Sequence, residues 1–171
     1  MSAALRWGGT AARLVLAGVF ALAGWSKVFD LAASGRAVNA YRLMPYDLAK
    51  IIGAALPFIE LALALFLLLG LATRFAAAVT AGLLVVYTVG ISSAWARGLR
   101  IDCGCFSAGG DLAAGVRPTY LWDIVRDLAL LAVAVFLFLL PRTAVSVDDY
   151  VLGPPADRGR EEEAHEFQGQ G

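Results

Sequence analysis

The sequence predicts an all-α integral membrane protein, an up-down bundle of four transmembrane helices. Of its 171 residues, 60% are hydrophobic and only 16% are charged, whereas soluble domains are roughly 45–50% apolar and about 25% charged. Four apolar runs, at residues 12–29, 51–72, 75–96 and 121–140, are each long enough to cross a hydrocarbon core of about 30 Å as a helix. None alternates with period two, which excludes a β-barrel. The composition also excludes a water-soluble enzyme.

The first run, residues 12–29, follows Arg6 and Arg13 and has the apolar character of a secretory signal peptide. It is long for a signal, however, and it continues through Trp25 and Phe29 without a small-x-small cleavage site. We therefore expect a retained transmembrane helix, preceded by a short N-terminal segment at residues 1–11.

The second and third runs, residues 51–72 and 75–96, are separated only by Thr73 and Arg74. A link of this length joins two antiparallel neighbouring helices. Pro57 stands inside the second run, where it cannot donate a backbone hydrogen bond, so we expect a kink there.

The fourth run, residues 121–140, follows a glycine-rich loop at residues 99–120, and a longer polar link at residues 30–50 joins the first two runs. Residues 12–142 therefore form one membrane domain. The chain then becomes polar and acidic, and residues 143–171 are predicted to form a disordered tail.

An even number of spans places both termini on one side of the membrane and the two long loops on the other. Positive charges normally mark the cytoplasmic side, but here the two sides nearly tie and raw counting favours the loop side. Two arginines precede the first span, which usually dominates orientation, and disulfide chemistry in the second loop favours an oxidising compartment. We therefore expect cytoplasmic termini and an extracytoplasmic cysteine loop.

The sequence has only two cysteines, Cys103 and Cys105, on either side of Gly104. A disulfide needs Cα atoms roughly 4.4–6.8 Å apart, and fully extended residues two apart lie at about 7 Å. The loop must therefore bend, and Gly104 bends at the least cost. Strained or exposed disulfides exchange readily, so Cys103 and Cys105 are the candidate catalytic residues for thiol–disulfide exchange. Arg100 nearby would favour the reactive thiolate.

The cysteine pair leaves other uses open. It can form an inert bridge, take part in assembly or supply two thiolates to a metal. A structural zinc site usually needs four protein ligands, and the remaining soft donor, His165, lies far away in the tail. We therefore predict no metal site, and because the sequence has no basic patch we predict no nucleic-acid partner.

Charged residues inside the predicted spans form a second candidate site. They are Lys27, Glu60, Asp123, Arg126 and Asp127. In an up-down bundle all five lie in the half nearest the cysteine loop, and the last three share one helix face. Membrane-embedded charges normally pair inside the bundle, so we expect Arg126 to reach Glu60 and Lys27 to reach Asp123 or Asp127. Such a cluster either relays protons and holds the head of a quinone, or fixes helix register as a salt-bridge network.

These segments resemble a known family, the methylamine-utilisation MauE group within the DoxX-like integral membrane proteins. The resemblance covers about residues 10–142. Its carrying segments are GVFALAGWSKVF at residues 18–29, LPFIE at 56–60, LGLATR at 69–74 and DCGCF at 102–106, with Trp122, Arg126 and Asp127 in the fourth span. The Cys-Gly-Cys-Phe segment narrows the resemblance to the MauE-like branch.

The resemblance implies a four-helix bundle in the bacterial cytoplasmic (plasma) membrane and a role in protein maturation. MauE is regarded as needed for processing, transport or disulfide formation of the β-subunit of methylamine dehydrogenase, alongside a thioredoxin-like protein. No thioredoxin-like segment is found in this sequence, so the resemblance implies a separate extracytoplasmic thioredoxin-like partner and a secreted client that the sequence does not identify.

We therefore expect a membrane thiol–disulfide redox protein that exchanges a disulfide through Cys103 and Cys105, with quinone as the candidate electron acceptor. Two alternatives stay open. A non-catalytic assembly or export partner would depend on loop contacts such as those of Tyr41 or Tyr46, and a small proton-coupled transporter would use Glu60.

Overall fold

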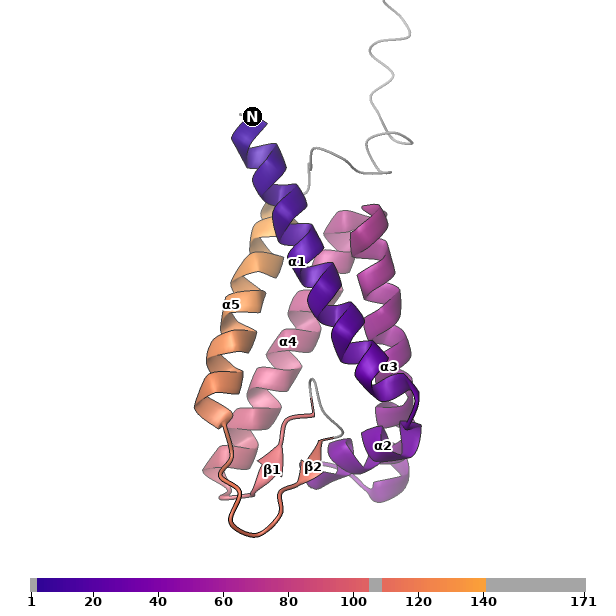
Figure 1. Ribbon diagram of the computed structural model, residues 1–171, viewed down its shortest axis with the longest axis vertical. Coiled ribbons are helices and arrows are strands. Elements are labelled where there is room, and N and C mark those ends of the chain that lie inside the picture. Colours follow the sequence, from indigo (N-terminus) through magenta and orange to yellow (C-terminus); the bar gives the residue numbers. More distant parts are fainter. Residues whose placement is uncertain (1–2, 105–108, 141–171) are drawn as a thin grey trace, which may run out of the picture.

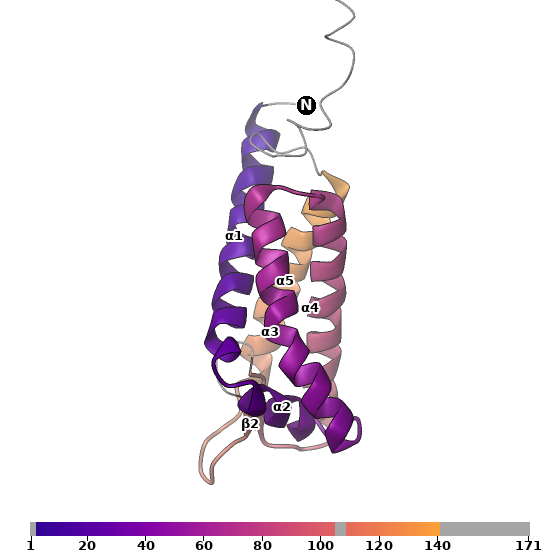
Figure 2. The same cartoon turned by 90° about the vertical axis from the view of Figure 1, so that its right-hand side faces the viewer.

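The computed structural model describes residues 3–104 and 109–140, and within them the chain forms five helices and one two-stranded sheet. The helices are α1 (Ala3–Val28), α2 (Leu31–Ala40), α3 (Tyr46–Leu69), α4 (Thr73–Ala96) and α5 (Tyr120–Leu139), and the strands are β1 (Ile101–Asp102) and β2 (Gly110–Asp111). The four long helices lie side by side, and α2 and the strands lie at one end of the bundle (Figure 1, Figure 2). The predicted all-α bundle is confirmed.

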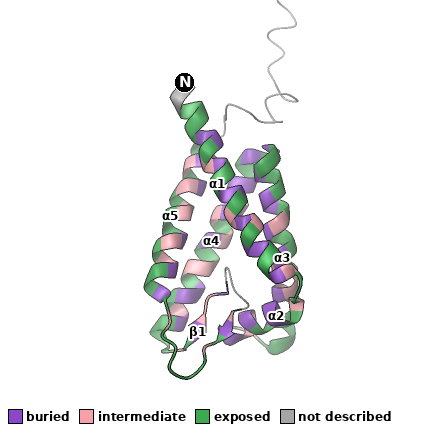
Figure 3. Cartoon of the chain, viewed as in Figure 1, coloured by how far each residue is buried: buried purple, intermediate pink, exposed green. Residues whose placement is uncertain are grey.

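The outer surface of the bundle is apolar, as a lipid-facing surface must be. Leu22, Phe58 and Val86 are exposed together with many other large apolar side chains, and exposed residues follow α1 and α3 along their whole lengths (Figure 3). Three described helices are long and apolar enough to cross a membrane: residues Leu5–Val28, α3 and α4. The chain is therefore a multi-pass membrane protein.

Helix α5 has 20 residues and packs along α4. It is as apolar as the other long helices, but it is set apart from the three candidate spans by three charged residues in its first turns, Asp123, Arg126 and Asp127. The count of four spans therefore stays a prediction, although the four long helices run antiparallel in the up-down order (Figure 1).

Two apolar clusters form the core. The larger cluster includes Leu16, Phe20, Leu63, Leu67, Leu84 and Leu137. The smaller cluster, near the strands, consists of Ala40, Ile91, Ala94, Ile101 and Tyr120. The side chains of Lys27, Glu60, Asp123 and Asp127 are buried among the helices, so they are shielded from bulk water.

The connection between α3 and α4 differs from the predicted link. Thr73 and Arg74 belong to the first turn of α4, and the turn is made by Gly70–Ala72 instead. Gly70 adopts a left-handed φ of 68°, and the backbone N–H groups of Gly70 and Leu71 both donate to the carbonyl of Phe66. A left-handed glycine ends a helix in this way because it has no Cβ to clash, and this signal was present in the sequence.

The polar link at residues 30–50 contains a helix that the sequence did not predict. Asp30 caps α2, with its Oδ1 accepting a hydrogen bond from Ala33 N at 2.8 Å. Helix α2 then crosses α3 at a pair of glycines, because a Cβ added to Gly53 would lie 2.6 Å from the Cα of Gly35. This backbone contact holds α2 under the bundle, where it forms one wall of the site described below.

Candidate functional site

The cysteine segment is carried by a small hairpin at the end of the bundle. Strands β1 and β2 pair in antiparallel fashion, with Ile101 opposite Asp111. Cys103 follows β1 and is half-buried, while Cys105 lies outside the described residues. Gly104 has the left-handed φ of 70°, and its N–H donates to Asp102 Oδ1 at 3.2 Å. The bend that the sequence requires therefore occurs at this glycine.

Side chains from three helices hold this hairpin in place. The Tyr41 hydroxyl of α2 donates to the Cys103 carbonyl at 3.1 Å, and Arg97 at the end of α4 donates from Nη2 to the Tyr41 carbonyl at 2.6 Å. The N–H of Ile101 donates to the hydroxyl of Tyr120 on α5 at 3.0 Å. The position of Cys103 is thus fixed by the bundle and not only by its own turn.

Three charged residues of α5 form an ion cluster beneath Cys103. Arg126 bonds Asp123 Oδ1 from Nη1 at 3.2 Å and Asp127 Oδ1 from Nη2 at 2.9 Å. The same Nη2 lies 3.8 Å from Cys103 Sγ, within hydrogen-bonding distance for sulfur. Both carboxylates are buried. The guanidinium therefore joins two carboxylates and the cysteine sulfur in one contact.

The arginine that we expected to act on the cysteines, Arg100, points elsewhere. Its Nη2 donates to the Val116 carbonyl at 2.6 Å, in an exposed position. Arg126 contacts the Cys103 sulfur instead, although it is far from it in the sequence. Sequence proximity suggested Arg100, but only the packing of α5 against the hairpin brings Arg126 there.

A second ion pair joins α1 to α3. Lys27 Nζ lies 2.8 Å from Glu60 Oε1 and 2.9 Å from Oε2, and Glu60 is only 1% exposed. The hydroxyl of Tyr87 on α4 donates to the same carboxylate at 2.8 Å. The two helices can approach closely because α1 has Gly24 at the crossing: an added Cβ would lie 2.8 Å from the Pro57 carbonyl oxygen. The buried charges are thus paired and hydrogen-bonded.

These pairings differ from those expected. We predicted Arg126 with Glu60 and Lys27 with Asp123 or Asp127, and both predictions are wrong. Helix α1 packs mainly on α3, which places Lys27 against Glu60, whereas Arg126 turns to the carboxylates of its own helix. The sequence shows which charges lie at similar depth, but the helix faces that meet are set by packing.

The two ion clusters nevertheless meet across a small cavity of about 20 Å³. It is lined by Glu60 and Tyr87 on one side and by Arg126 and Asp127 on the other, with apolar residues around them. Asp127 Oδ2 is buried and has no hydrogen-bond partner within the described part of the chain. The cavity has about the volume that one water molecule needs. The expectation that the charged residues share one half of the bundle is therefore met by their geometry.

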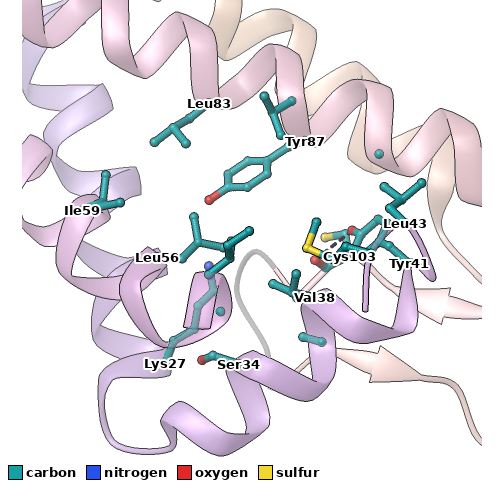
Figure 4. A pocket seen from close by; sticks show the side chains of 17 residues that line it. Lys27, Ser34, Val38, Tyr41, Leu43, Leu56, Ile59, Leu83, Tyr87 and Cys103 are labelled. Carbon is teal, nitrogen blue, oxygen red and sulfur yellow. Dashed lines mark hydrogen bonds between the residues drawn. The ribbon is translucent and has the colours of Figure 1, made fainter. Parts of the chain in front are cut away.

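A larger cavity of about 340 Å³ lies between α2, α3, α4 and the hairpin. Figure 4 shows Lys27 and Tyr87 reaching into it from α1 and α4, and Cys103 and Tyr41 bordering it on another side. The remaining wall is mostly apolar and includes Val38, Leu43, Met44, Ile52, Leu56, Ile59, Leu83 and Val86. The ammonium of Lys27, the hydroxyls of Tyr41 and Tyr87 and the sulfur of Cys103 therefore border a mostly apolar space.

The family model described as "Methylamine utilisation protein MauE" matches residues 5–140. The chain belongs to the MauE family. The match includes all of the described helices except the first residues of α1, and it contains every site residue named above.

Two curated relatives in the MauE family carry the name methylamine utilization protein MauE. The protein of Paracoccus denitrificans is 31% identical over 126 residues, which cover 72% of this chain and 64% of the relative. The protein of Methylorubrum extorquens is 37% identical over 107 residues, or 61% and 54% of the two chains. The chain thus spans less than two thirds of the length of either relative. No solved structure gives a significant match.

Sequence reasoning missed Tyr87 of this MauE-family site, and it named Tyr41 only as a loop contact of an assembly or export partner. Tyr87 bonds Glu60, and Tyr41 bonds the backbone of Cys103. Tyr87 could have been found, because it carries a hydroxyl in the middle of the apolar run at residues 75–96, where such a group requires a partner. The contact of Tyr41 with Cys103 could not have been predicted, because it depends on the unpredicted helix α2.

Proposed function

We propose that this MauE-family chain is a redox protein of the bacterial cytoplasmic membrane that exchanges disulfides through Cys103 and Cys105. The observation that carries the proposal is the contact of 3.8 Å between Arg126 Nη2 and Cys103 Sγ. Thiol–disulfide exchange proceeds through thiolates, and a guanidinium beside the sulfur stabilises the thiolate form. Asp123 and Asp127 hold that guanidinium in place.

On the basis of this contact we propose different roles for the two cysteines. A thiolate of a thioredoxin-like partner attacks the sulfur of Cys105 in the Cys103–Cys105 disulfide, and Cys103 leaves as the thiolate that Arg126 stabilises. The second thiol of the partner then loses its proton and attacks the mixed disulfide, which releases Cys105. The partner gains a disulfide, and both cysteines end as thiols. A better-stabilised thiolate leaves faster, so Arg126 favours this direction of attack.

The proposed membrane arrangement has α5 as the fourth span, cytoplasmic termini and the hairpin outside the cytoplasm. In support, the start of α1 and the end of α5 lie at one end of the bundle, and the hairpin lies at the other (Figure 1). The charges of α5 are paired with each other, which lowers the cost of placing them in the membrane. An extracytoplasmic hairpin would meet secreted clients where disulfides persist.

The curated relatives are named for methylamine utilisation. We therefore propose the same process for this chain, with the β-subunit of methylamine dehydrogenase as the client that the family resemblance implies. A separate thioredoxin-like protein would carry the disulfide between Cys103–Cys105 and that client.

The proposal is tested in cells that produce the Cys103→Ser/Cys105→Ser variant. We expect the thioredoxin-like partner and the client to accumulate as thiols, detected by alkylation and a gel shift, while Arg100→Gln cells resemble the wild type. Normal client oxidation in the double variant would refute the redox role and favour an assembly or export partner. The transporter alternative would require that purified protein move a solute into liposomes and that Glu60→Gln abolish this movement.

A further inference from the structure

The cavity of about 340 Å³ has the size and the wall of a ligand site. Small-molecule pockets have volumes of roughly 300–1,000 Å³ and are mainly apolar with a few polar groups. Here the apolar wall is supplied mainly by α2, α3 and α4, and the polar groups include those of Lys27, Ser34, Tyr41 and Tyr87. Among the residues that line it, Leu43, Ile59 and Val86 are also exposed on the outer, lipid-facing surface. A ligand could therefore enter from the bilayer.

Lys27, which lines the cavity, is paired with Glu60, and this ion pair favours a neutral ligand at that end of the cavity. The ammonium of Lys27 is bonded to both oxygens of Glu60, so this end carries no net charge. The Glu60 carboxylate offsets much of the attraction that Lys27 would exert on an anionic lipid head. Lys27 has three N–H donors and uses two on Glu60, which leaves one for a carbonyl oxygen of the ligand.

Tyr87 also lines the cavity, and its hydroxyl donates to Glu60. This bond holds the phenol in place at the cavity wall. A head group that presents a carbonyl oxygen would match the remaining donor of Lys27. Cys103 borders the same cavity, which places a redox-active residue at its wall.

From these observations we infer that the cavity binds a lipid-soluble quinone, which accepts the electrons of the cysteine pair. This inference rests on the proposed function. Oxidation of the Cys103 and Cys105 thiols to a disulfide releases two electrons and two protons, and a quinone that takes up both becomes a quinol. The cavity thus assigns the quinone to Lys27 and Tyr87, whereas the sequence had suggested the whole charged cluster of Lys27, Glu60, Asp123, Arg126 and Asp127.

Binding is tested with the full chain, freed of native lipid and held in detergent. The probe is a benzoquinone that carries one isoprenoid unit, titrated by isothermal titration calorimetry against empty micelles as the blank. We expect saturable binding of one molecule per chain. Cys103→Ser/Cys105→Ser should bind equally well, because cysteine chemistry is not needed for occupancy.

Two substitutions fill the cavity. Val86→Trp should weaken binding at least tenfold, and its matched control is Val85→Trp, which lies beside it on α4, is also exposed, and does not line the cavity. Leu56→Trp, from the opposite wall on α3, should have the same effect. Wild-type affinity in folded Val86→Trp and Leu56→Trp would overturn the inference.

A second ligand tests whether the cavity is specific for a quinone, and a redox measurement tests whether the quinone accepts the electrons of the cysteine pair. Decanol has a tail but no quinone ring, and equal binding of decanol would show a general lipid cavity and overturn the inference. Mixing the reduced protein with the quinone under anaerobic conditions should form quinol and protein disulfide, and binding without oxidation would overturn the acceptor role. Loss of quinone binding with intact disulfide exchange would leave the proposed function standing, whereas quinone binding without disulfide exchange would refute the proposed function.

Discussion

Replacing Arg126 with glutamine removes the guanidinium that contacts the Cys103 sulfur at 3.8 Å. At that distance, two unit charges attract by about 1 kcal/mol in water and by about 4 kcal/mol at an effective dielectric constant of about 20. Asp123 and Asp127 partly neutralise the guanidinium, so a value near the lower end of this range, about 1–1.4 kcal/mol, applies. Since about 1.4 kcal/mol corresponds to a factor of ten, the thiolate population of Cys103 should fall by about five- to tenfold.

The assay uses a Cys105→Ser background, so that Cys103 is the only thiol of the chain. The rate of alkylation by iodoacetamide is measured near pH 7 on the detergent-solubilised protein, and Arg126→Gln should react about five- to tenfold more slowly. Arg100→Gln is the matched control, because Arg100 bonds the Val116 carbonyl and has the same charge. Its rate should change by less than twofold.

Folding is checked by circular dichroism and size-exclusion chromatography, because the Arg126→Gln variant leaves Asp123 and Asp127 without their cation. If that variant does not fold, the Arg126→Lys variant is used to test the role of the positive charge. It keeps the charge and should keep most of the alkylation rate of Cys103. An unchanged rate in folded Arg126→Gln would refute the reasoning. An equal decrease in Arg100→Gln would refute it as well.

Three further predictions concern stability and the hairpin. Gly53→Ala places a Cβ against the backbone of α2 and should cost about 1–3 kcal/mol, seen as a lower melting temperature, whereas Gly82→Ala, with open space around it, should not. Lys27→Met leaves the buried Glu60 carboxylate unpaired and should cost about 3–5 kcal/mol; the Lys27→Met/Glu60→Met double variant should recover most of this loss in urea unfolding. Tyr41→Phe removes a hydrogen bond worth about 1 kcal/mol, so amide exchange in residues 101–104 should become faster. No destabilisation in Gly53→Ala, no recovery in the double variant, or unchanged exchange in Tyr41→Phe would each contradict the corresponding contact.

Much of the bundle could be predicted because lipid imposes a simple rule on the sequence. Apolar runs of sufficient length must be helices, and the residues that break this apolarity must find partners inside. Lys27, Glu60 and Arg126 were therefore recognisable as interior residues, and all three are paired within the bundle. Helix α2 escaped prediction because it is short and mixed in composition, and its stability comes from its glycine crossing with α3.

The site was less predictable than the fold. The partner of each charge depends on how the helices are rotated about their axes, and a one-residue difference in rotation changes the face by about 100°. For this reason Lys27 was assigned to α5 although it bonds Glu60 on α3. The cavity is a space between three helices and the hairpin, and no single segment of sequence encodes such a space.

The central claim, that Cys103 and Cys105 form an exchangeable disulfide outside the cytoplasm, is tested most directly by trapping their redox state in living cells. Cells are acidified, and the cysteines are labelled with a membrane-impermeant thiol reagent before and after external reduction. We predict little labelling before reduction and labelling of both cysteines after it. Labelling without reduction would contradict the disulfide, and labelling only after the cells are opened would contradict the extracytoplasmic location.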